Sequence, residues 1–262
     1  MLPEKPCQRF VRLWEYHTNT VPERLQKLIA TAGYGSRRWA ERLIDQGRIE
    51  LNNKTAKIGD KAEISDKVKI DGRRVDLARY QEEETKVIIL NKQAGVICSN
   101  NDTEGRKNVY DLLPKGSRWV MVGRLDLNTS GLLLFTNNGM LANKLMHPSS
   151  KIDREYAVRV LGKVNDEDLK RLTEGLELED GFAKFNRVTV AGGEGANRWY
   201  KVILREGRKR EVRRLWEELG FKVSRLIRIR FGEIRLPDSL RANQFEYLKP
   251  GQVNLLLKDA KL

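Results

Sequence analysis

An acidic residue lies between two apolar runs in the segment VGRLDLNTSGLLLF, residues 122–135. Asp126 follows Arg124 at a spacing of two, and an ionised side-chain carboxylate can act as a nucleophile. If an extended strand continues through this segment, Arg124 and Asp126 lie on the same face of it. The polar run NTSG that follows consists of residue types that make turns through local side-chain hydrogen bonds. The segment alone therefore leaves two interpretations of Asp126 open, a turn residue and a nucleophile.

A strongly basic segment, residues 205–230, contains ten Lys and Arg against four Asp and Glu. Apolar residues at positions i, i+3, i+4 and i+7 within it predict an amphipathic helix, whose core face consists of Val212, Leu215, Trp216 and Leu219. On this helix Arg210, Arg213 and Arg214 share another side. Such a side can bind an anionic ligand, and it can equally be an ordinary solvated surface.

The charge of the whole chain supports an anionic partner. Its 262 residues include 50 Lys and Arg and 36 Asp and Glu, which gives a net charge of +14 and a pI near 9.8. Such an excess attracts polyanions through phosphate contacts and counterion release. A basic pI does not by itself distinguish RNA, DNA and an anionic membrane. No segment resembles a lysine-rich amphipathic membrane helix, so we expect a nucleic acid.

Other classes of protein are disfavoured by composition. Two cysteines and two histidines are scattered along the chain and offer neither a disulfide framework nor metal-ligand spacing, so no metal site is expected. No apolar run is long enough to span a bilayer. The first residues, 1–22, lack an apolar segment of the signal-peptide type, which leaves a short extension or a weak organelle-targeting tail, and the former is favoured. We therefore expect a cytoplasmic protein.

Residues 23–80 predict a small unit of two helices followed by a small sheet. Leu25, Leu28 and Ile29 have helical spacing. A second helix is expected after Ser36, a good N-cap, with Gly47 at its C-terminal end. The dipeptides Asn52-Asn53 and Asp71-Gly72 predict tight turns between the short strands that follow.

This unit resembles the S4 RNA-binding domain, and the stretch RLQKLIATAGYGSRRWAERLIDQGRIELNN carries the resemblance. The resemblance implies that Arg37, Arg38 and nearby basic residues such as Lys27 contact an RNA backbone. A polar segment, residues 81–86, is expected to link this unit to the rest of the chain.

Residues 87–262 predict a larger domain. Short β-type runs such as KVIILNK, GLLLFTN, REYAVRV and RWYKVIL alternate with three helical stretches, NGMLANKLMH, NDEDLKRLTEGL and KREVRRLWEELG. The whole chain is therefore expected to be an α+β protein, in which a mainly antiparallel mixed sheet flanked by helices follows the N-terminal unit.

Several segments of this domain, taken in order, resemble the pseudouridine synthases. GRLDLNTSGLLLFTNNG resembles the central motif of that family, in the form used by the branch acting on ribosomal RNA. LNKQAGVICS resembles the first motif, REYAVRV the segment with the active-site tyrosine, and LREGRKREVRRLWEELGFKVSRLIRIRFGEIRLP the C-terminal basic motif. Together with the S4-like unit, the resemblance covers about residues 23–257.

The resemblance implies a site and a reaction. Asp126 takes the position of the catalytic aspartate, Arg213 that of the arginine that pairs with it, and Tyr156 that of the tyrosine that stacks on the target base and helps with its C5 proton. Arg124 fits a role in holding the nucleotide flipped out. Lys92 and Arg214 are further candidates for substrate binding. The reaction that the resemblance implies is the isomerisation of a specific uridine in RNA to pseudouridine, with Asp126 as the nucleophile. It involves neither oxidation nor hydrolysis, so the resemblance implies no cofactor.

The sequence departs from the family pattern in the first motif, where Gln93 follows Lys92 in place of the usual proline, and at Glu211, where glutamine is frequent. Loss of the proline puts the structural role of that segment in doubt. The added charge of Glu211 lies close to Arg213 along the chain.

The resemblance implies a partner, large-subunit ribosomal RNA or its assembly precursor, with the protein acting as a monomer. Two alternatives remain open at this point. One is a related synthase that modifies small-subunit ribosomal RNA or tRNA, and the other is a non-catalytic S4-bearing assembly protein that only binds RNA.

Overall fold

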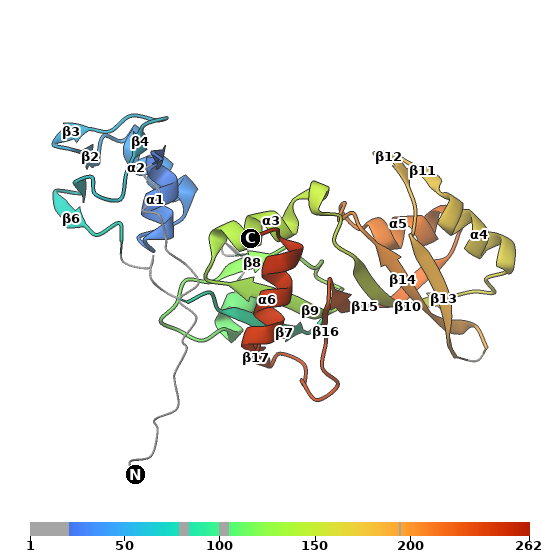
Figure 1. The fold of residues 1–262 in the computed structure, drawn as a ribbon. Helices are drawn as coiled ribbons and strands as arrows, with labels where there is room; N and C mark the ends of the chain where they lie inside the picture. Colours follow the sequence, from blue (N-terminus) through green and yellow to red (C-terminus); the bar gives the residue numbers. More distant parts are fainter. Residues whose placement is uncertain (1–20, 79–83, 100–104, 194) are drawn as a thin grey trace, which may run out of the picture. The chain divides into compact units, whose positions relative to one another are not determined.

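The computed structural model describes residues 21–78, 84–99, 105–193 and 195–262. The chain divides into two compact units, Met1–Glu83 and Glu84–Leu262, shown in Figure 1. Residues 1–20 of the expected extension and residues 81–83 of the expected linker lie outside the described ranges. Within those ranges, no helix combines the length and the apolar character that crossing a membrane requires.

The first unit contains the two predicted helices, α1 (Leu25–Thr31) and α2 (Arg37–Asp45). Ser36 caps α2, since its side chain accepts a hydrogen bond from the Trp39 amide at 3.1 Å. Gly47 follows this helix with φ +68°, a conformation that favours glycine. The predicted helix boundaries are therefore confirmed.

A four-stranded antiparallel sheet in the order β3-β2-β5-β6 completes this unit. Its strands are Ile49–Leu51 (β2), Lys54–Thr55 (β3), Val68–Ile70 (β5) and Arg73–Val75 (β6), and a separate ladder joins β1 (Glu23–Arg24) to β4 (Lys61–Ala62). Both predicted turns have positive φ at their two central residues, 51° and 64° at Asn52-Asn53 and 50° and 75° at Asp71-Gly72. That geometry suits the twist of a two-residue hairpin.

The second unit is built on one mixed sheet with the order β13-β14-β10-β15-β9-β7-β17 (Figure 1). Its strands are Val87–Lys92 (β7), Ser130–Thr136 (β9), Arg154–Leu161 (β10), Arg187–Gly192 (β13), Asn197–Leu204 (β14), Lys222–Phe231 (β15) and Phe245–Tyr247 (β17). Two short strands, β8 (Val120–Val122) and β16 (Ile234–Arg235), pair with β9 and β15. The predicted mainly antiparallel mixed sheet, and with it the α+β class, is confirmed.

The central pairing of this sheet is parallel and short. Strands β9 and β15 pair only at Ser130 with Ile227 and at Gly131 with Arg228. Gly131 has φ +102°, and a Cβ atom placed on it would lie 2.3 Å from the Arg228 carbonyl oxygen. Only glycine therefore allows the two strands to approach here.

We expect Gly131→Ala to lower the free energy of unfolding by about 2–4 kcal/mol, because the new methyl group meets backbone that cannot rotate away. Gly139→Ala is the matched control. Gly139 has no positive φ, and an added Cβ would meet nothing within 4 Å. It begins a helix, so alanine there should be neutral or stabilising. Urea denaturation of the two variants tests this, and equal midpoints would contradict it.

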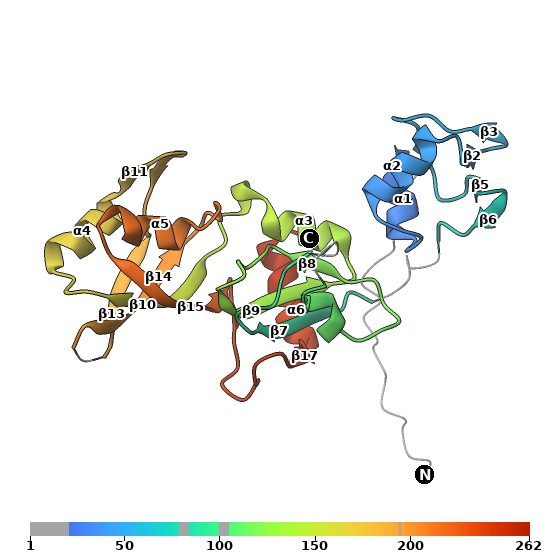
Figure 2. The ribbon, with the colours of Figure 1, turned by 180° about the vertical axis from the view of Figure 1, so that it is seen from behind.

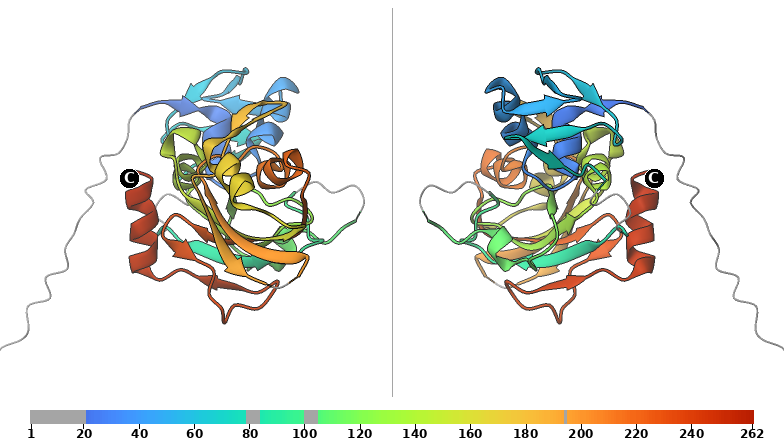
Figure 3. Two further views of the ribbon diagram at one scale, coloured as in Figure 1. Left: turned by 90° about the vertical axis from the view of Figure 1, so that its right-hand side faces the viewer. Right: turned by 90° about the vertical axis from the view of Figure 1, so that its left-hand side faces the viewer.

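Two hydrophobic clusters lie on opposite faces of strands β7 and β9. One contains Ile88 and Leu133 and continues beneath α5 (Glu211–Glu218) to Trp216, and the other contains Ile89 and Leu134. Helices α3 (Gly139–Met146) and α6 (Pro250–Asp259) contribute to the second cluster. Figure 3 shows α6 as the red helix at the C-terminal end of the chain.

On strands β10, β13, β14 and β15, all the covering elements lie on one face. They are α4 (Asp166–Glu174), α5 and the hairpin of β11 (Leu176–Leu178) and β12 (Gly181–Ala183), as the opposed views in Figures 1 and 2 show. Helices α3, α4 and α5 were predicted. Helix α6 was not, although Pro250 at its first turn and the spacing of Val253 and Leu256 signal it.

Candidate active site

The predicted site residues are organised by one row that crosses the sheet. Tyr156 on β10 pairs with Arg228 on β15, Arg228 pairs with Gly131 on β9, and Gly131 pairs with Lys92 on β7. Since neighbouring strands lie about 4.8 Å apart, this row spans about 14 Å between its ends. The register therefore brings Tyr156 and Lys92, 64 residues apart in the sequence, into one region of the sheet.

Asp126 lies in the loop that connects β8 to β9 at the Lys92 end of this row. The strand does not continue through Arg124 and Asp126, so alternation does not apply to them: β8 ends at Val122, and Gly123 turns the chain with φ +75°. The side chains of Arg124 and Asp126 are exposed, whereas Leu125 between them is buried. The buried leucine anchors the loop while its neighbours remain accessible.

Lys92 fixes the backbone of this loop. Its side chain is fully buried, and its ammonium donates hydrogen bonds to the carbonyl oxygens of Asp126 at 3.1 Å, Leu127 at 3.4 Å and Thr129 at 2.8 Å. A fourth carbonyl, of Gln93, accepts at 3.1 Å. Burial lowers the pKa of Lys92, and the negative charge of Asp126 acts against this. Its three N–H groups are thus directed at protein carbonyls, and a direct contact of Lys92 with substrate stays a prediction.

Arg213 also holds this loop, through a second carbonyl contact. Its guanidinium donates to the Asn128 carbonyl oxygen and to the Val223 carbonyl oxygen, each at 2.9 Å. Because it is 7% exposed, it does not share a solvated side of α5 with Arg210. Burial lowers the pKa of Arg213, Arg210 lowers it further, and the charge of Asp126 raises it. Arg213 thus ties the β8–β9 loop to the start of β15.

The Asp126 carboxylate is presented by this fixed loop without a partner of its own. Among the described residues, it makes no hydrogen bond and no ion pair, so the expected direct pair with Arg213 is not formed. Its charge nevertheless acts on both Lys92 and Arg213. The Asp126 backbone carbonyl, in contrast, accepts from Lys92 and from the Thr129 amide at 3.0 Å. The loop therefore immobilises the backbone of Asp126 and leaves its carboxylate accessible, in a field of two buried cations.

Tyr156 lies at the other end of the row. It is 9% exposed and belongs to the hydrophobic cluster beneath α5. Its cross-strand neighbours are Arg228 and, on β14, Val202. Its phenol interacts electrostatically with Arg154. Tyr156 thus has an apolar environment on one side and basic groups on the other.

Arg228 is a buried cation that our sequence interpretation did not single out. It is 2% exposed, its Nε donates to the Leu132 carbonyl oxygen at 2.7 Å, and its guanidinium lies 5.5 Å from the centre of the Phe231 ring. One terminal nitrogen is buried without a hydrogen-bond partner among the described residues. Alternation offered a signal, since Arg228 follows Leu226 at a spacing of two and so shares its core-facing side.

Gln93 explains how the first motif is held without proline. Its amide donates to the Asn243 side-chain oxygen at 3.2 Å, and its own side-chain oxygen accepts from the Asn243 side-chain nitrogen at 2.6 Å. The Asn243 amide in turn donates to the Asn91 carbonyl oxygen at 2.7 Å. Proline could make neither bond of this reciprocal pair, since it has no N–H and no amide side chain. The turn is therefore fixed by a long-range contact.

The remaining predicted site residues are placed as follows. Arg214 makes a two-pronged ion pair with Asp180 at 2.7 and 2.9 Å, which engages its charge. In the first unit, Lys27 pairs with Glu23. Arg37 and Arg38 are exposed in the first turn of α2 and have no partner among the described residues. Also within that part of the chain, no group of three or more His, Cys, Asp or Glu is arranged to hold a metal ion.

Glu211, the other departure from the family pattern, is buried at the first residue of α5, where its carboxylate accepts from the Arg208 amide at 3.1 Å. Burial raises the pKa of Glu211, and Glu206 adds to the effect, whereas the Arg208 amide and the charges of Arg208 and Arg214 oppose it. The Glu211 carboxyl group therefore ionises at a lower pH in the unfolded chain than in the folded protein. Its contribution to stability is present below its unfolded pKa, falls as the pH rises toward its folded pKa, and is lost above that value.

We therefore expect Glu211→Gln to raise the melting temperature at pH 7 by about 2–4 °C, since the neutral amide can still accept the Arg208 bond. The difference should disappear when the pH falls below the unfolded pKa of about 4.3. Glu218→Gln, an exposed change on the same helix, is the control and should have little effect. A lower melting temperature for Glu211→Gln at pH 7 would show that the burial cost is outweighed by its charged neighbours.

Comparison with known proteins gives a consistent result. The sequence model described as RNA pseudouridylate synthase matches residues 86–218, and that of the S4 domain matches residues 23–67. The chain is 54% identical over 222 residues to ribosomal large subunit pseudouridine synthase B of Yersinia pestis, which covers 83% of this chain and 70% of the relative. The protein of the same name from Escherichia coli strain K12 is 51% identical over 238 residues, 89% of this chain and 82% of the relative.

A solved structure described as a crystal structure of pseudouridylate synthase has a similar fold. The TM-score is 0.63 at 24% sequence identity, and the match covers 89% of this chain and 99% of that one.

Proposed function

The chain belongs to the RNA pseudouridylate synthase family, and from this premise we propose that it isomerises a uridine of large-subunit ribosomal RNA to pseudouridine, with Asp126 as the nucleophile. One observation carries the assignment of the residue. Asp126 combines an exposed carboxylate, which has no partner in the described part of the chain, with a loop backbone held by Lys92 and Arg213. A nucleophile needs this combination of free side-chain atoms and fixed position.

The reaction needs few groups. The N1–C1′ bond of the uridine breaks, the base rotates, a C5–C1′ bond forms, and the proton on C5 is lost while N1 regains one. No electron or external group is exchanged, so the proposal includes no cofactor. The carboxylate of Asp126 attacks either C1′ or C6, or assists departure of the base. The charge of Asp126 interacts with the positive charges of Lys92 and Arg213.

The other site residues take supporting roles in this proposal. In this proposal Tyr156 stacks on the flipped base, since an extruded base needs a flat partner, and helps with the C5 proton. The exposed side chain of Arg124 helps to hold the nucleotide outside its helix. Arg37 and Arg38 contact RNA phosphates from the first unit, where their charges are unpaired among the described residues. The protein is proposed to act as a cytoplasmic monomer.

The choice of large-subunit RNA rests on the names of the two relatives, both of which are more than 50% identical. The test is release of tritium from a large-subunit transcript labelled at C5 of uridine. Stoichiometric release by the wild-type protein is expected. Absence of release on every ribosomal RNA would favour a non-catalytic assembly protein. Mapping pseudouridines in a strain without the gene identifies the target, and a missing mark in small-subunit RNA or tRNA would overturn the large-subunit assignment.

A further inference from the structure

Within the described part of the second unit, one face of strands β10, β13, β14 and β15 has no helix packed on it. On strands β10, β13, β14 and β15, alternate residues such as Val158 and Tyr200 lie beneath α4 and α5. Their neighbours along the strands point the other way, where Figures 1 and 2 show no helix. Trp199 and Ile203 on this opposite face remain half-buried, and Lys201 between them is exposed. A sheet face of mixed apolar and basic character is thus available for a partner.

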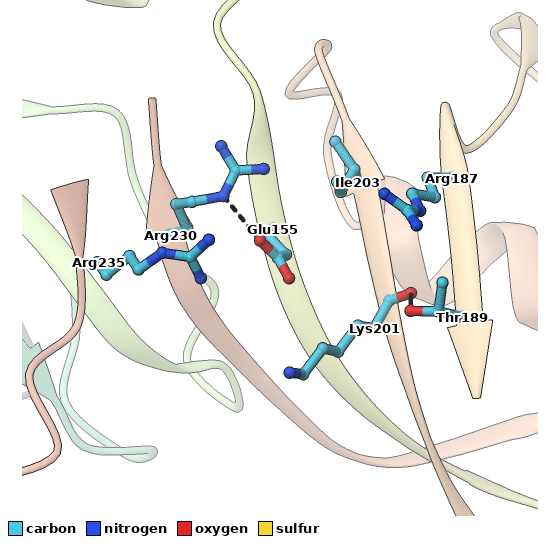
Figure 4. A pocket seen from close by; sticks show the side chains of 7 residues that line it. All are labelled: Glu155, Arg187, Thr189, Lys201, Ile203, Arg230 and Arg235. Atoms are coloured by element: carbon cyan, nitrogen blue, oxygen red, sulfur yellow. Dashed lines mark hydrogen bonds and ion pairs between the residues drawn. The ribbon is translucent and has the colours of Figure 1, made fainter. Parts of the chain in front are cut away.

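Basic side chains gather on this face. A hollow of about 220 Å³ is lined by Glu155, Arg187, Thr189, Lys201, Ile203, Arg230 and Arg235, and Figure 4 shows them. Glu155 is the one acidic residue in this lining, and Arg230 pairs with it at 2.7 Å. The charges of Arg187, Lys201 and Arg235 have no hydrogen-bond or ion-pair partner among the described residues. We call these three residues the basic triad.

The hollow leads toward the candidate active site. A groove of about 1490 Å³ shares Lys201 and Arg235 with the hollow and extends to Arg213 and Asn128, the contact that holds the Asp126 loop. The exposed Arg225, also unpaired in the described part of the chain, lines this groove. The cations therefore form a path that ends beside the proposed catalytic loop.

Clustered like charges without partners destabilise the folded protein, and an anion on this face would relieve that repulsion. A single small anion would use only part of a path of this length. A polyanion with regularly spaced charges would use all of it, and the half-buried Trp199 and Ile203 offer an apolar floor between the cations. Charge complementarity thus favours a nucleic-acid backbone over a small anion.

We propose that the basic triad, on the sheet face opposite α5, and the groove that leads from it to Arg213 bind the phosphodiester backbone of the substrate RNA outside the target nucleotide. This inference rests on the proposed function for the identity of the RNA. It adds a second anchoring surface, which engages a segment of the RNA remote from the reacting base and so favours long or folded substrates over short ones.

The test compares two triple variants with the same loss of charge. Arg187→Gln, Lys201→Gln and Arg235→Gln together remove the basic triad. Lys144→Gln, Lys163→Gln and Lys258→Gln, also at exposed positions, serve as the matched control. Binding of a large-subunit RNA domain is measured as a function of salt, without turnover. We expect the basic-triad variant to lose on the order of 10- to 100-fold in affinity and its salt slope to decrease by about 2–3, with the control close to wild type.

Equal losses in the two variants would overturn the proposal, because they would show only general attraction of a basic protein. Unchanged affinity for RNA alone, with weaker binding of a ribosomal particle, would also overturn it and would indicate an acidic protein partner. A charge-retaining variant, Arg187→Lys with Arg235→Lys, should recover most of the affinity, which separates lost charge from a damaged fold. Since the readout is binding, it stands apart from any failure of the wild-type protein to form pseudouridine.

Discussion

Asp126→Asn is expected to abolish pseudouridine formation, with a fall in kcat of at least about 10³-fold. Asparagine has the shape of aspartate but is a far poorer nucleophile. The Asp126 backbone carbonyl, which accepts hydrogen bonds from Lys92 and Thr129, is unchanged by the substitution. The loop should therefore keep its structure, and the loss should be chemical. Release of tritium from a C5-labelled transcript measures it.

Two further measurements make this test specific. The affinity of Asp126→Asn for the RNA should stay within about 3-fold of wild type, since the substitution removes a negative charge and no cation. The control Asp166→Asn changes another exposed acid of the same unit, outside the groove, and should leave turnover near the wild-type rate. Undiminished tritium release by Asp126→Asn would contradict the assignment of this residue as the nucleophile.

Arg213→Met is expected to lower kcat by about 10²–10³-fold and to destabilise the fold by about 2–4 kcal/mol. The change leaves the carbonyl oxygens of Asn128 and Val223 without their donor, and it removes a cation close to the Asp126 carboxylate. Single-turnover rates and urea denaturation separate the two effects. Arg213→Lys should recover part of the rate, because it restores the charge and one donor, but not the two-pronged geometry.

Arg214→Met is the matched control for Arg213→Met, since it removes the neighbouring arginine of the same helix. Its partner Asp180 is exposed, so solvent screens the ion pair and its loss should have little effect on stability. We expect turnover to change by less than about 3-fold. Equal losses of rate in Arg213→Met and Arg214→Met would show that the basic character of α5, and not the loop contact of Arg213, is what matters.

The sequence predicted those parts of the fold that obey local rules. The cap at Ser36, the turn at Asp71-Gly72 and the core stripe of α5 each depend on residues within a few positions of one another, and all three are present. The wrong expectations concern long-range contacts. Where β8 ends depends on the loop that Lys92 and Arg213 hold, and neither partner is close to that loop in the sequence.

The sequence also predicted the candidate site only in part. Resemblance to a family indicated Asp126, Tyr156 and Arg213, but not what their side chains contact. The register that places Tyr156 beside Arg228 includes an irregularity between Glu155 and Tyr156, which alternation alone does not reveal. The sequence also offered no sign that Asn243, 150 residues away, fixes the turn at Gln93 in the absence of the usual proline.

The short parallel pairing of β9 with β15 joins two lobes of the second unit, and the candidate site residues are distributed between these lobes. Asp126 and Lys92 belong to the lobe of β7, β8 and β9, whereas Tyr156, Arg213 and Arg228 belong to the lobe of β10, β14 and β15. Two arginines of the second lobe donate hydrogen bonds to carbonyl oxygens of the first lobe, Arg213 to Asn128 and Arg228 to Leu132. Neither lobe holds a complete set of reactive groups, so the candidate site exists only where the two lobes are joined, and a change that loosens this junction would separate Asp126 from Tyr156 without altering either residue.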